Sequence, residues 1–319
     1  RLIGLIRKFP SDSNLPLTLT NFLKIHPNLK LEDIYKRGSW TRLVVQAFPE
    51  QAMTTAKDGL IKVYESAIRN KLLSCDGFAY LQFLQELVGN DFVLTKQMNP
   101  RMAVMCHYDF WQKPGDKLGF ASLAQSLNAL DQPELKAELL EVLALLINRI
   151  RYEQFALSEL LFNPLQAHAR YTREQILAGF GVTTFAYQKP AREGVLMIPE
   201  QNSELLFVTL NKNEKQFSPT TMYHDYAINE QLFHWQSQNS ARPERGKGLS
   251  YIEHQQMGKR IFLFVREQSK DEYGTMGFVN FGEVEYVSHH GSQPMSITWQ
   301  LKTPMPHFMW KQAAKLAVG

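Results

Sequence analysis

The stretch RIFLFVRE, Arg260–Glu267, decides the fold class of the C-terminal half of the chain. Its centre is a continuous run of Ile, Phe, Leu and Val, which is typical of a β-strand buried on both faces. Five further runs rich in β-branched and aromatic residues lie at Gly194–Ile198, Glu204–Leu210, Leu249–His254, Gly277–Ser288 and Met295–Leu301. Together with a helix before them at Ala169–Gly181 and another from Pro306, these runs predict a small β-barrel-like domain with flanking helices.

The N-terminal half has a helical pattern instead. Within Asp58–Leu73, apolar side chains recur at three- and four-residue steps, which indicates an amphipathic helix. A second clear helix begins near Pro133, a residue that suits the first helical turn, and Glu134 favours the positive end of the helix dipole. The pattern changes near Asn163. The sequence therefore predicts an α+β protein, with an all-helical connector or accessory domain over residues 1–162 and a β-barrel-like recognition domain over residues 163–319.

Composition narrows the classes of function. The chain has 319 residues and a net charge of +4, and its basic excess is spread over both halves without a polybasic block. Charge alone therefore does not predict tight binding to nucleic acid. The two cysteines, Cys75 and Cys106, lie far apart, as is usual in a reducing compartment. The apolar run Val142–Ile147 is too short to span a bilayer, and the opening RLIGLIRKFP contains neither Met nor a signal-peptide core. We expect a cytoplasmic fragment of a longer chain.

One stretch, SPTTMYHDYAINEQLFHWQSQ at Ser218–Gln238, gathers residue types that carry chemistry. Catalysis is one interpretation, because His224 and Asp225 resemble a base with an orienting carboxylate. Neighbouring residues on a strand point to opposite faces, however, which argues against contact between the two side chains. A metal site is a second interpretation, although the candidate ligands follow no spacing with a known metal geometry. These ligands are His224, Asp225, His234, His254, His289 and His290.

Buried core and a recognition pocket are the two remaining interpretations of this stretch. Alternation around His234 places Phe233 and Trp235 on one side of a strand, and Phe217 also fits a core. The polar residues between them fit better in a pocket that stacks a flat group, such as an extruded or modified base, and binds its edge. The residues expected at this pocket are Tyr223, His224, Asp225, Tyr226, Trp235, Gln236 and Gln238.

Basic residues near this stretch are candidates for contacts with phosphate. Arg242, Arg245 and Lys247 lie in the Pro/Gly-rich segment SARPERGKG, and Lys212 follows a predicted strand. Acidic neighbours dilute both groups, so ordinary solvated loops are the alternative. Arg170 precedes the helix that opens the second domain, where it is expected to border the same rim or to join the two domains.

A resemblance to a known family rests on four segments, HARYTREQILAGFG, LLFVTLNKNEKQFSPTTMYHDYAINEQLFHWQSQ, IFLFVRE and YVSHHGSQPMSITWQL. They are similar to a bacterial domain of unknown function. That domain occurs at the C-terminus of superfamily II DEAD/DEAH helicases that carry a phospholipase D-type nuclease domain, and also beside HNH nuclease domains. The helical half, including LTLTNFLKIHPNLKLEDIY and HYDFW, resembles the connector between the helicase core and this domain.

The resemblance implies work on DNA in bacterial restriction or antiviral defence, with upstream helicase and nuclease domains of the same parent chain as partners. The chain contains no GxxxxGK[ST] loop, no DExx box with an arginine finger, no HxK pair and no HNH-like cluster. No catalytic activity, metal or cofactor is therefore expected of this fragment, and ATP and Mg²⁺ would belong to the upstream motor. We expect a DNA-binding accessory region whose barrel reads DNA, including a modified or extruded base. The alternatives are a protein-interaction module that docks the motor onto a partner and a cryptic metal-dependent nuclease.

Overall fold

The computed structural model describes residues 1–36, 38–51, 54–157, 160, 162–190, 192–210 and 225–318. The chain divides into two compact units. Unit 1 comprises Arg1–Arg151, Phe162–Pro164 and Glu174–Lys189. Unit 2 comprises Tyr152–Leu161, Leu165–Arg173 and Pro190–Gly319. The two units are therefore interleaved along the chain, because two stretches beyond residue 161 cluster with the N-terminal helices.

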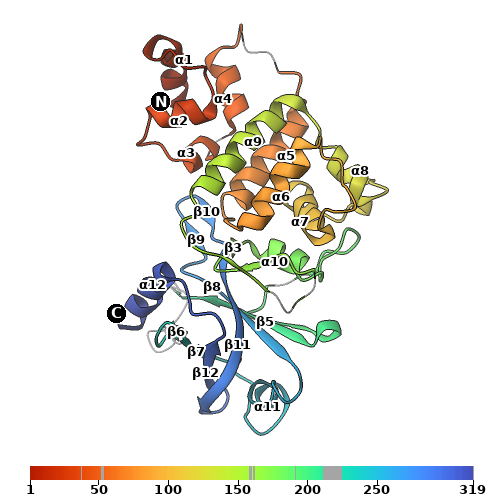
Figure 1. Ribbon diagram of the computed structural model, residues 1–319, viewed down its shortest axis with the longest axis vertical. Coiled ribbons are helices and arrows are strands. Elements are labelled where there is room, and N and C mark those ends of the chain that lie inside the picture. Colours follow the sequence, from red (N-terminus) through yellow and green to blue (C-terminus); the bar gives the residue numbers. More distant parts are fainter. Residues whose placement is uncertain are drawn as a thin grey trace. The chain divides into compact units, whose positions relative to one another are not determined.

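Unit 1 is helical, as the sequence predicts for the N-terminal part (Figure 1). The α-helices of its first segment are α1 (Leu2–Asp12), α2 (Leu19–Ile25), α3 (Leu31–Tyr35), α4 (Trp40–Ala47), α5 (Asp58–Ala67), α6 (Phe78–Gly89), α7 (Pro100–Trp111), α8 (Leu123–Asn128) and α9 (Pro133–Asn148). A π-helical turn, η1 (Ile68–Leu72), continues α5, and a 3₁₀ turn, η2 (Asp116–Leu118), precedes α8. The helix α10 (Arg173–Gly179) begins in unit 2 and continues in unit 1.

Local signals explain where several of these helices begin. The Ser39 side chain caps α4 by accepting a hydrogen bond from the backbone N–H of Arg42. Pro133 occupies the first turn of α9, and the side chain of Gln132 caps that helix by accepting from the N–H of Leu135 at 2.8 Å. The place of Pro133 confirms the sequence prediction. In α5 the predicted apolar stripe is buried at Tyr64 and Ala67.

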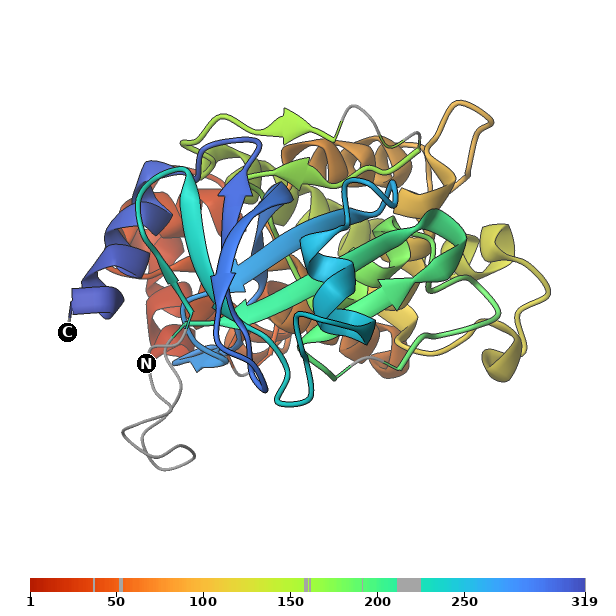
Figure 2. The same cartoon turned by 90° about the horizontal axis from the view of Figure 1, so that it is seen from below.

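Unit 2 is built around one twisted sheet, in which the strands follow the order β4-β5-β8-β11-β12-β7-β6 and β3 pairs with β11 (Figures 1 and 2). Its strands are β3 (Arg170–Tyr171), β4 (Val195–Ile198), β5 (Ser203–Thr209), β6 (Tyr226–Ala227), β7 (Leu232–Gln236), β8 (Arg260–Arg266), β11 (Phe278–His290) and β12 (Ser296–Leu301). Two small ribbons pair β1 (Phe155–Ala156) with β2 (Gln166–Ala167) and β9 (Lys270–Asp271) with β10 (Gly274–Thr275).

The two most apolar strands, β5 and β8, pair in parallel in the interior of the sheet. Residues Leu205–Val208 and Ile261–Val265 are all buried, which confirms the expectation that these runs are covered on both faces. By contrast, β3, β8 and β12 all pair with β11 antiparallel. A core cluster forms on one side of the sheet, and its members include Leu206, Trp235, Leu263, Phe281 and Trp299.

Two expectations for this region need correction. The sheet does not close into a barrel within the described residues, because β4 and β6 stand at opposite ends of the strand order and do not pair. The run Leu249–His254, expected as a strand, belongs to the helix α11 (Gly246–Ile252) and the turn after it. In α11 and the turn after it, the buried positions Gly248, Tyr251 and His254 recur every third residue, which is a helical spacing. The run Leu249–His254 contains only two of these positions, which are too few to reveal it.

Two helices accompany the sheet. The helix α11 lies near one end of the sheet, and α12 (His307–Val318) packs beside β6, in agreement with the helix predicted from Pro306 (Figures 1 and 2). No helix among the described residues is long and apolar enough to cross a membrane.

Candidate functional site

Strand β7 sorts the residues of the chemistry-rich stretch onto two faces of the sheet. Its burial alternates, so Phe233 and Trp235 face the core while His234 and Gln236 lie half-buried on the other face. The Trp235 ring meets the ring of Tyr251 edge-on at 5.3 Å and lies 6.0 Å from that of Trp299. Trp235 is only 4% exposed, so its side chain forms part of the core and does not border a pocket.

The opposite face of this part of the sheet carries a stack of aromatic rings. Tyr226 on β6 pairs with His234 on β7, and their rings are stacked with centroids 4.7 Å apart and planes 13° apart. The His290 ring, at the end of β11, lies 6.0 Å from that of His234. We call Tyr226, His234 and His290 the outer aromatic face. Asp225 fixes the approach to it, because its Oδ1 accepts a hydrogen bond from the backbone N–H of Gln236 at 2.8 Å.

The segment that follows β7 forms a closed loop, Arg242–Gly248, which we call the basic loop. Arg242 and Arg245 form a backbone bridge, and the α-carbon of Gly248 is so close to the Arg242 carbonyl that a Cβ would lie 1.9 Å from its oxygen. The Arg242 guanidinium donates from Nε and Nη2 to the side-chain oxygen of Gln293 at 3.0 and 3.1 Å. Gln293 lies in the turn between β11 and β12, so the loop is held against the end of the sheet.

The outer aromatic face and the basic loop lie at the same end of the sheet. Gln236 pairs with Ser296, and Ser296 pairs with His290. The turn that carries Gln293 joins His290 to Ser296, and its backbone N–H donates to the carbonyl of Ala241 at 2.9 Å. The fold therefore brings together Asp225, Tyr226, Gln236 and Arg242 from the residues that the sequence singles out.

A buried ion cluster lies beside the basic loop. Glu204 on β5 is fully buried and pairs with two lysines, with Lys247 at 2.6 Å and with the buried Lys259. The hydroxyl of Tyr251 donates to the side-chain oxygen of Gln238 at 2.9 Å. Burial, and next the charge of Glu204, raise the pKa of Tyr251, so this hydroxyl stays protonated as a donor. Gln238 and Lys247 therefore contact the polar core and are less free than their sequence context suggests.

His254 completes the polar surroundings of this cluster. Its Nδ1 lies 2.9 Å from the carbonyl of Lys259, and its Nε2 accepts a hydrogen bond from the N–H of Tyr286 at 3.0 Å. Burial lowers the pKa of His254, so the ring is neutral and carries its proton on Nδ1. Its role in this position is to tie the turn after α11 to β11.

Arg170 is part of a structural contact. Its guanidinium donates to both carboxylate oxygens of Glu267 at 2.9 and 2.7 Å and to the carbonyl of Gly277 at 2.8 Å. This bidentate pair joins β3 to the segment after β8. Three other predicted site residues, Lys212, Tyr223 and His224, lie outside the described residues, as does Phe217.

Sequence reasoning missed the ion cluster around Glu204. The signal is present in hindsight, because a charged residue stands at or next to the beginning of each of the two most apolar strands. Glu204 is the second residue of β5, Arg260 is the first residue of β8, and Lys259 precedes it. Only the parallel register, in which Glu204 is opposite Ile261, brings these strand beginnings together.

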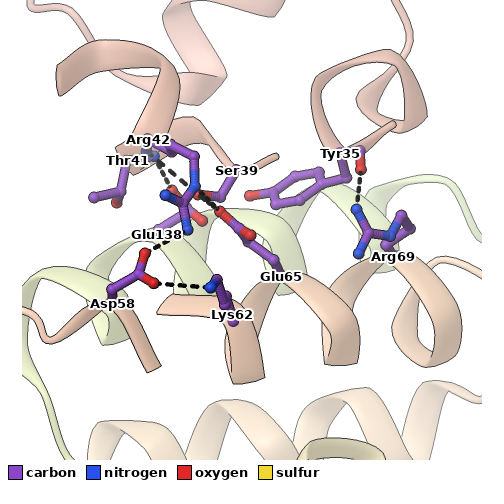
Figure 3. A network of polar contacts seen from close by, with 9 residues as sticks. All are labelled: Tyr35, Ser39, Thr41, Arg42, Asp58, Lys62, Glu65, Arg69 and Glu138. Carbon is purple, nitrogen blue, oxygen red and sulfur yellow. Dashed lines mark hydrogen bonds and ion pairs between the residues drawn. The ribbon is translucent and has the colours of Figure 1, made fainter. Parts of the chain in front are cut away.

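Unit 1 contains a separate polar network, between α3, α4, α5 and α9 (Figure 3). Glu65 accepts from the hydroxyl of Ser39 at 2.9 Å and from Nε of Arg42 at 2.7 Å, and Arg42 also pairs with Asp58 at 3.1 Å. The buried Glu138 accepts from the N–H of Thr41. These contacts fix the start of α4 against α5 and α9, which is a structural role.

Possible metal ligands do not cluster in the part of the chain that the structure describes. No three His, Cys, Asp or Glu side chains gather there in a geometry that could hold a metal ion. The carboxylate of Glu204 is accompanied by two lysines rather than by further carboxylates, which is unlike the acidic cluster of a metal-dependent nuclease.

In the comparisons with known proteins, a family model matches part of the chain. No curated protein sequence matches the chain. A crystal structure of Arabidopsis thaliana SUVH6 in complex with SAM has 13% sequence identity and a TM-score of 0.29, over 80% of this chain and 41% of that one. That TM-score is too low to support an argument about fold or function. Residues 165–313, which contain the main sheet of unit 2, match the model of a family described as a domain of unknown function, DUF3427.

Proposed function

We propose that unit 2 is a nucleic-acid-binding module that stacks a base on its outer aromatic face. The observation that carries this proposal is the stacked pair of Tyr226 and His234 on a half-buried face of the sheet, with His290 beside it. Aromatic rings on a sheet surface are a common platform for unpaired bases, and each stacked base contributes about 1–3 kcal/mol.

The neighbouring basic loop supports the choice of nucleic acid as the ligand. Arg242 is bonded to the neutral side chain of Gln293, so that contact leaves its charge uncompensated. Arg245 is exposed in the same loop. The two features match the two parts of a nucleotide. The aromatic rings can stack the flat base, and the cationic side chains of the basic loop can bind the charged phosphate.

The wider role in this proposal comes from the family resemblance. The chain would be the DNA-binding accessory region of a helicase/nuclease of restriction or antiviral defence, reading DNA that includes a modified or extruded base. The motor and the nuclease would be other parts of the parent chain, and ATP and Mg²⁺ would act there. A protein-interaction role is the alternative outcome of the experiment below.

The test is binding of fluorescently labelled single-stranded and duplex oligonucleotides to the whole chain, followed by anisotropy. We expect Tyr226→Ala and His234→Ala to weaken binding about 5- to 150-fold, which corresponds to the loss of one stacking contact. Thermal unfolding should change little, since both side chains are half-buried. The matched control is Phe155→Ala, which removes a partly exposed ring from the separate β1–β2 ribbon.

Trp235→Ala is the contrasting variant, because its ring is in the core. It should cost about 3–5 kcal/mol of stability without a selective effect on binding. The proposal is wrong if the wild-type chain binds neither oligonucleotide, or if Tyr226→Ala and His234→Ala bind as tightly as the wild type.

A further inference from the structure

Glu204, Lys247 and Lys259 form a cluster with a net charge of +1, from two ammonium groups and one carboxylate. Glu204 is fully buried, and the side chain of Lys259 is 4% exposed, whereas the side chain of Lys247 is 44% exposed. A buried carboxylate requires a partner, since an unpaired charge in the interior is strongly destabilising. One ammonium group is enough for that purpose, and Glu204 has two.

The buried lysine is the permanent partner of the two. Besides Glu204, Nζ of Lys259 contacts the hydroxyl of Ser250 at 3.2 Å and lies 5.3 Å from the centre of the Tyr251 ring. Lys247, the second partner of the Glu204 carboxylate, is partly exposed, so water already solvates its ammonium group. If Lys247 moved away, Glu204 would keep both its charge and its ion pair with Lys259.

The loop that carries Lys247 is built to hold its shape. Gly246 has a φ of +61°, and a Cβ at Gly248 would lie 1.9 Å from the Arg242 oxygen and 2.6 Å from the sulfur of Met295. The loop is therefore closed by direct backbone packing, and it presents Arg242, Arg245 and Lys247 from one short, fixed turn. A preformed turn loses little conformational entropy when its cations bind a polyanion.

We propose that Lys247 is a releasable phosphate ligand, which exchanges Glu204 for a phosphodiester group of bound nucleic acid while Lys259 keeps Glu204 neutralised. This inference rests on the proposed function, and it specifies the phosphate contact at the same site. Release of Lys247 leaves the fold intact, because the interior keeps its ion pair.

The experiment compares Lys247→Gln with Lys302→Gln in the full chain. Lys302 is a matched control, because its side chain is 38% exposed and pairs with Glu283 at 3.1 Å, beyond the end of β12 that is remote from the basic loop. Oligonucleotide affinity is measured between 50 and 200 mM salt. Each phosphate contact contributes a slope of about 0.7–0.9 in log affinity against log salt. The factor by which affinity falls between 50 and 200 mM salt should therefore be about threefold smaller for Lys247→Gln than for the wild type.

The outcomes separate this inference from the proposed function. Lys302→Gln should keep the wild-type slope, and both variants should keep the wild-type melting temperature. If oligonucleotides bind but Lys247→Gln has the wild-type slope, Lys247 is not a phosphate ligand, although nucleic-acid binding stands. If Lys247→Gln unfolds the chain, the lysine is a structural partner of Glu204 and the inference fails.

A second probe covers the case in which no oligonucleotide binds, which would overturn the proposed function. Inorganic pyrophosphate is then titrated into the wild type and Lys247→Gln, and the backbone amide signals of residues 245–248 are followed by NMR. Shifts in the wild type that disappear in the variant would support the phosphate site on its own. An absence of shifts in the wild type would overturn the inference as well.

Discussion

Asp109 and Glu138 are carboxyl groups that the helices of unit 1 keep away from water. Asp109 accepts from the hydroxyl of Tyr80 at 2.6 Å and from the amide of Gln175 at 3.0 Å, but its burial is the larger effect and raises its pKa to about 7. Burial likewise raises the pKa of Glu138 to about 7, against the lowering effect of the N–H of Thr41. Among the described residues, neither carboxyl forms a salt bridge, and the hydrogen-bond donors named here are all neutral.

These two groups predict an unusual dependence of stability on pH. Because their folded pKa values lie above the ordinary ones, the folded state keeps protons that the unfolded state releases between about pH 4 and pH 7. The free energy of unfolding should therefore fall over this range, by up to about 1.4 kcal/mol per pH unit for each group, and level off above it. Urea unfolding followed by helical circular dichroism at a series of pH values measures this slope.

The matching variants are Asp109→Asn and Glu138→Gln, and each should flatten the slope whatever its effect on stability at one pH. Glu86→Gln, at an exposed position of α6, should leave the slope as it is. A wild-type chain whose stability rises steadily from pH 4 to pH 7 would contradict the assignment of these groups as the source of the pH dependence.

At the scale of residues, alternation along a strand was predictable and register was not. The sequence places Phe233 and Trp235 on one side of β7 and His234 on the other, and the structure agrees. Which residue faces His234 from the next strand depends on pairing, so the stack with Tyr226 required the structure. The same holds for Glu204 and Lys259, which are 55 residues apart in the chain and meet through the parallel pairing of β5 and β8.

At the scale of elements, long periodic segments were predictable and short ones were ambiguous. The helices α5 and α9 and the strands β5 and β8 lie where their patterns predict them. The segment Leu249–Ile252 is helical, and the start of this helix packs closely on its own loop through Gly248 and the Arg242 carbonyl, a contact that a reading of strand propensity does not include. With this run in a helix, a closed barrel loses one of its expected strands.

The tight packing at Gly248 gives a prediction for α11. Gly248→Ala places a Cβ 1.9 Å from the Arg242 oxygen, so backbone must move, and we expect a loss of about 1–3 kcal/mol in stability. Gly59→Ala in α5 is the control, since a Cβ there has no atom within 4 Å and alanine favours a helix. Chemical denaturation of both variants measures the difference, and equal stability of the two would show that the loop accommodates the methyl group.

At the scale of the whole molecule, charge is spread thinly. A net charge of +4 without a basic block predicts that binding of nucleic acid has a shallow dependence on salt, reflecting only a few phosphate contacts. Reversing Arg242, Arg245 and Lys247 together to Glu should weaken binding for all oligonucleotide sequences alike, because phosphates carry no sequence information. Affinities for several oligonucleotide sequences, measured from about 50 to about 300 mM salt, test both the shallow salt dependence and the uniform effect of the triple reversal. Unchanged affinity after the triple reversal would remove the basic loop from the interface.

The parallel pair at the heart of unit 2 has a consequence for the order in which the chain folds. Thr209 and Arg266, which bond across β5 and β8, are 57 residues apart, and β6, β7 and α11 all lie in the intervening chain. The most apolar part of the sheet therefore cannot form by local zipping, since a long loop must close first at an entropic cost. The helices of unit 1, by contrast, close their backbone hydrogen bonds within each element, so helix can form before distant segments meet. We expect two kinetic phases on refolding, an early gain of helix signal and a slower burial of Trp235 and Trp299, which stopped-flow circular dichroism and tryptophan fluorescence would separate.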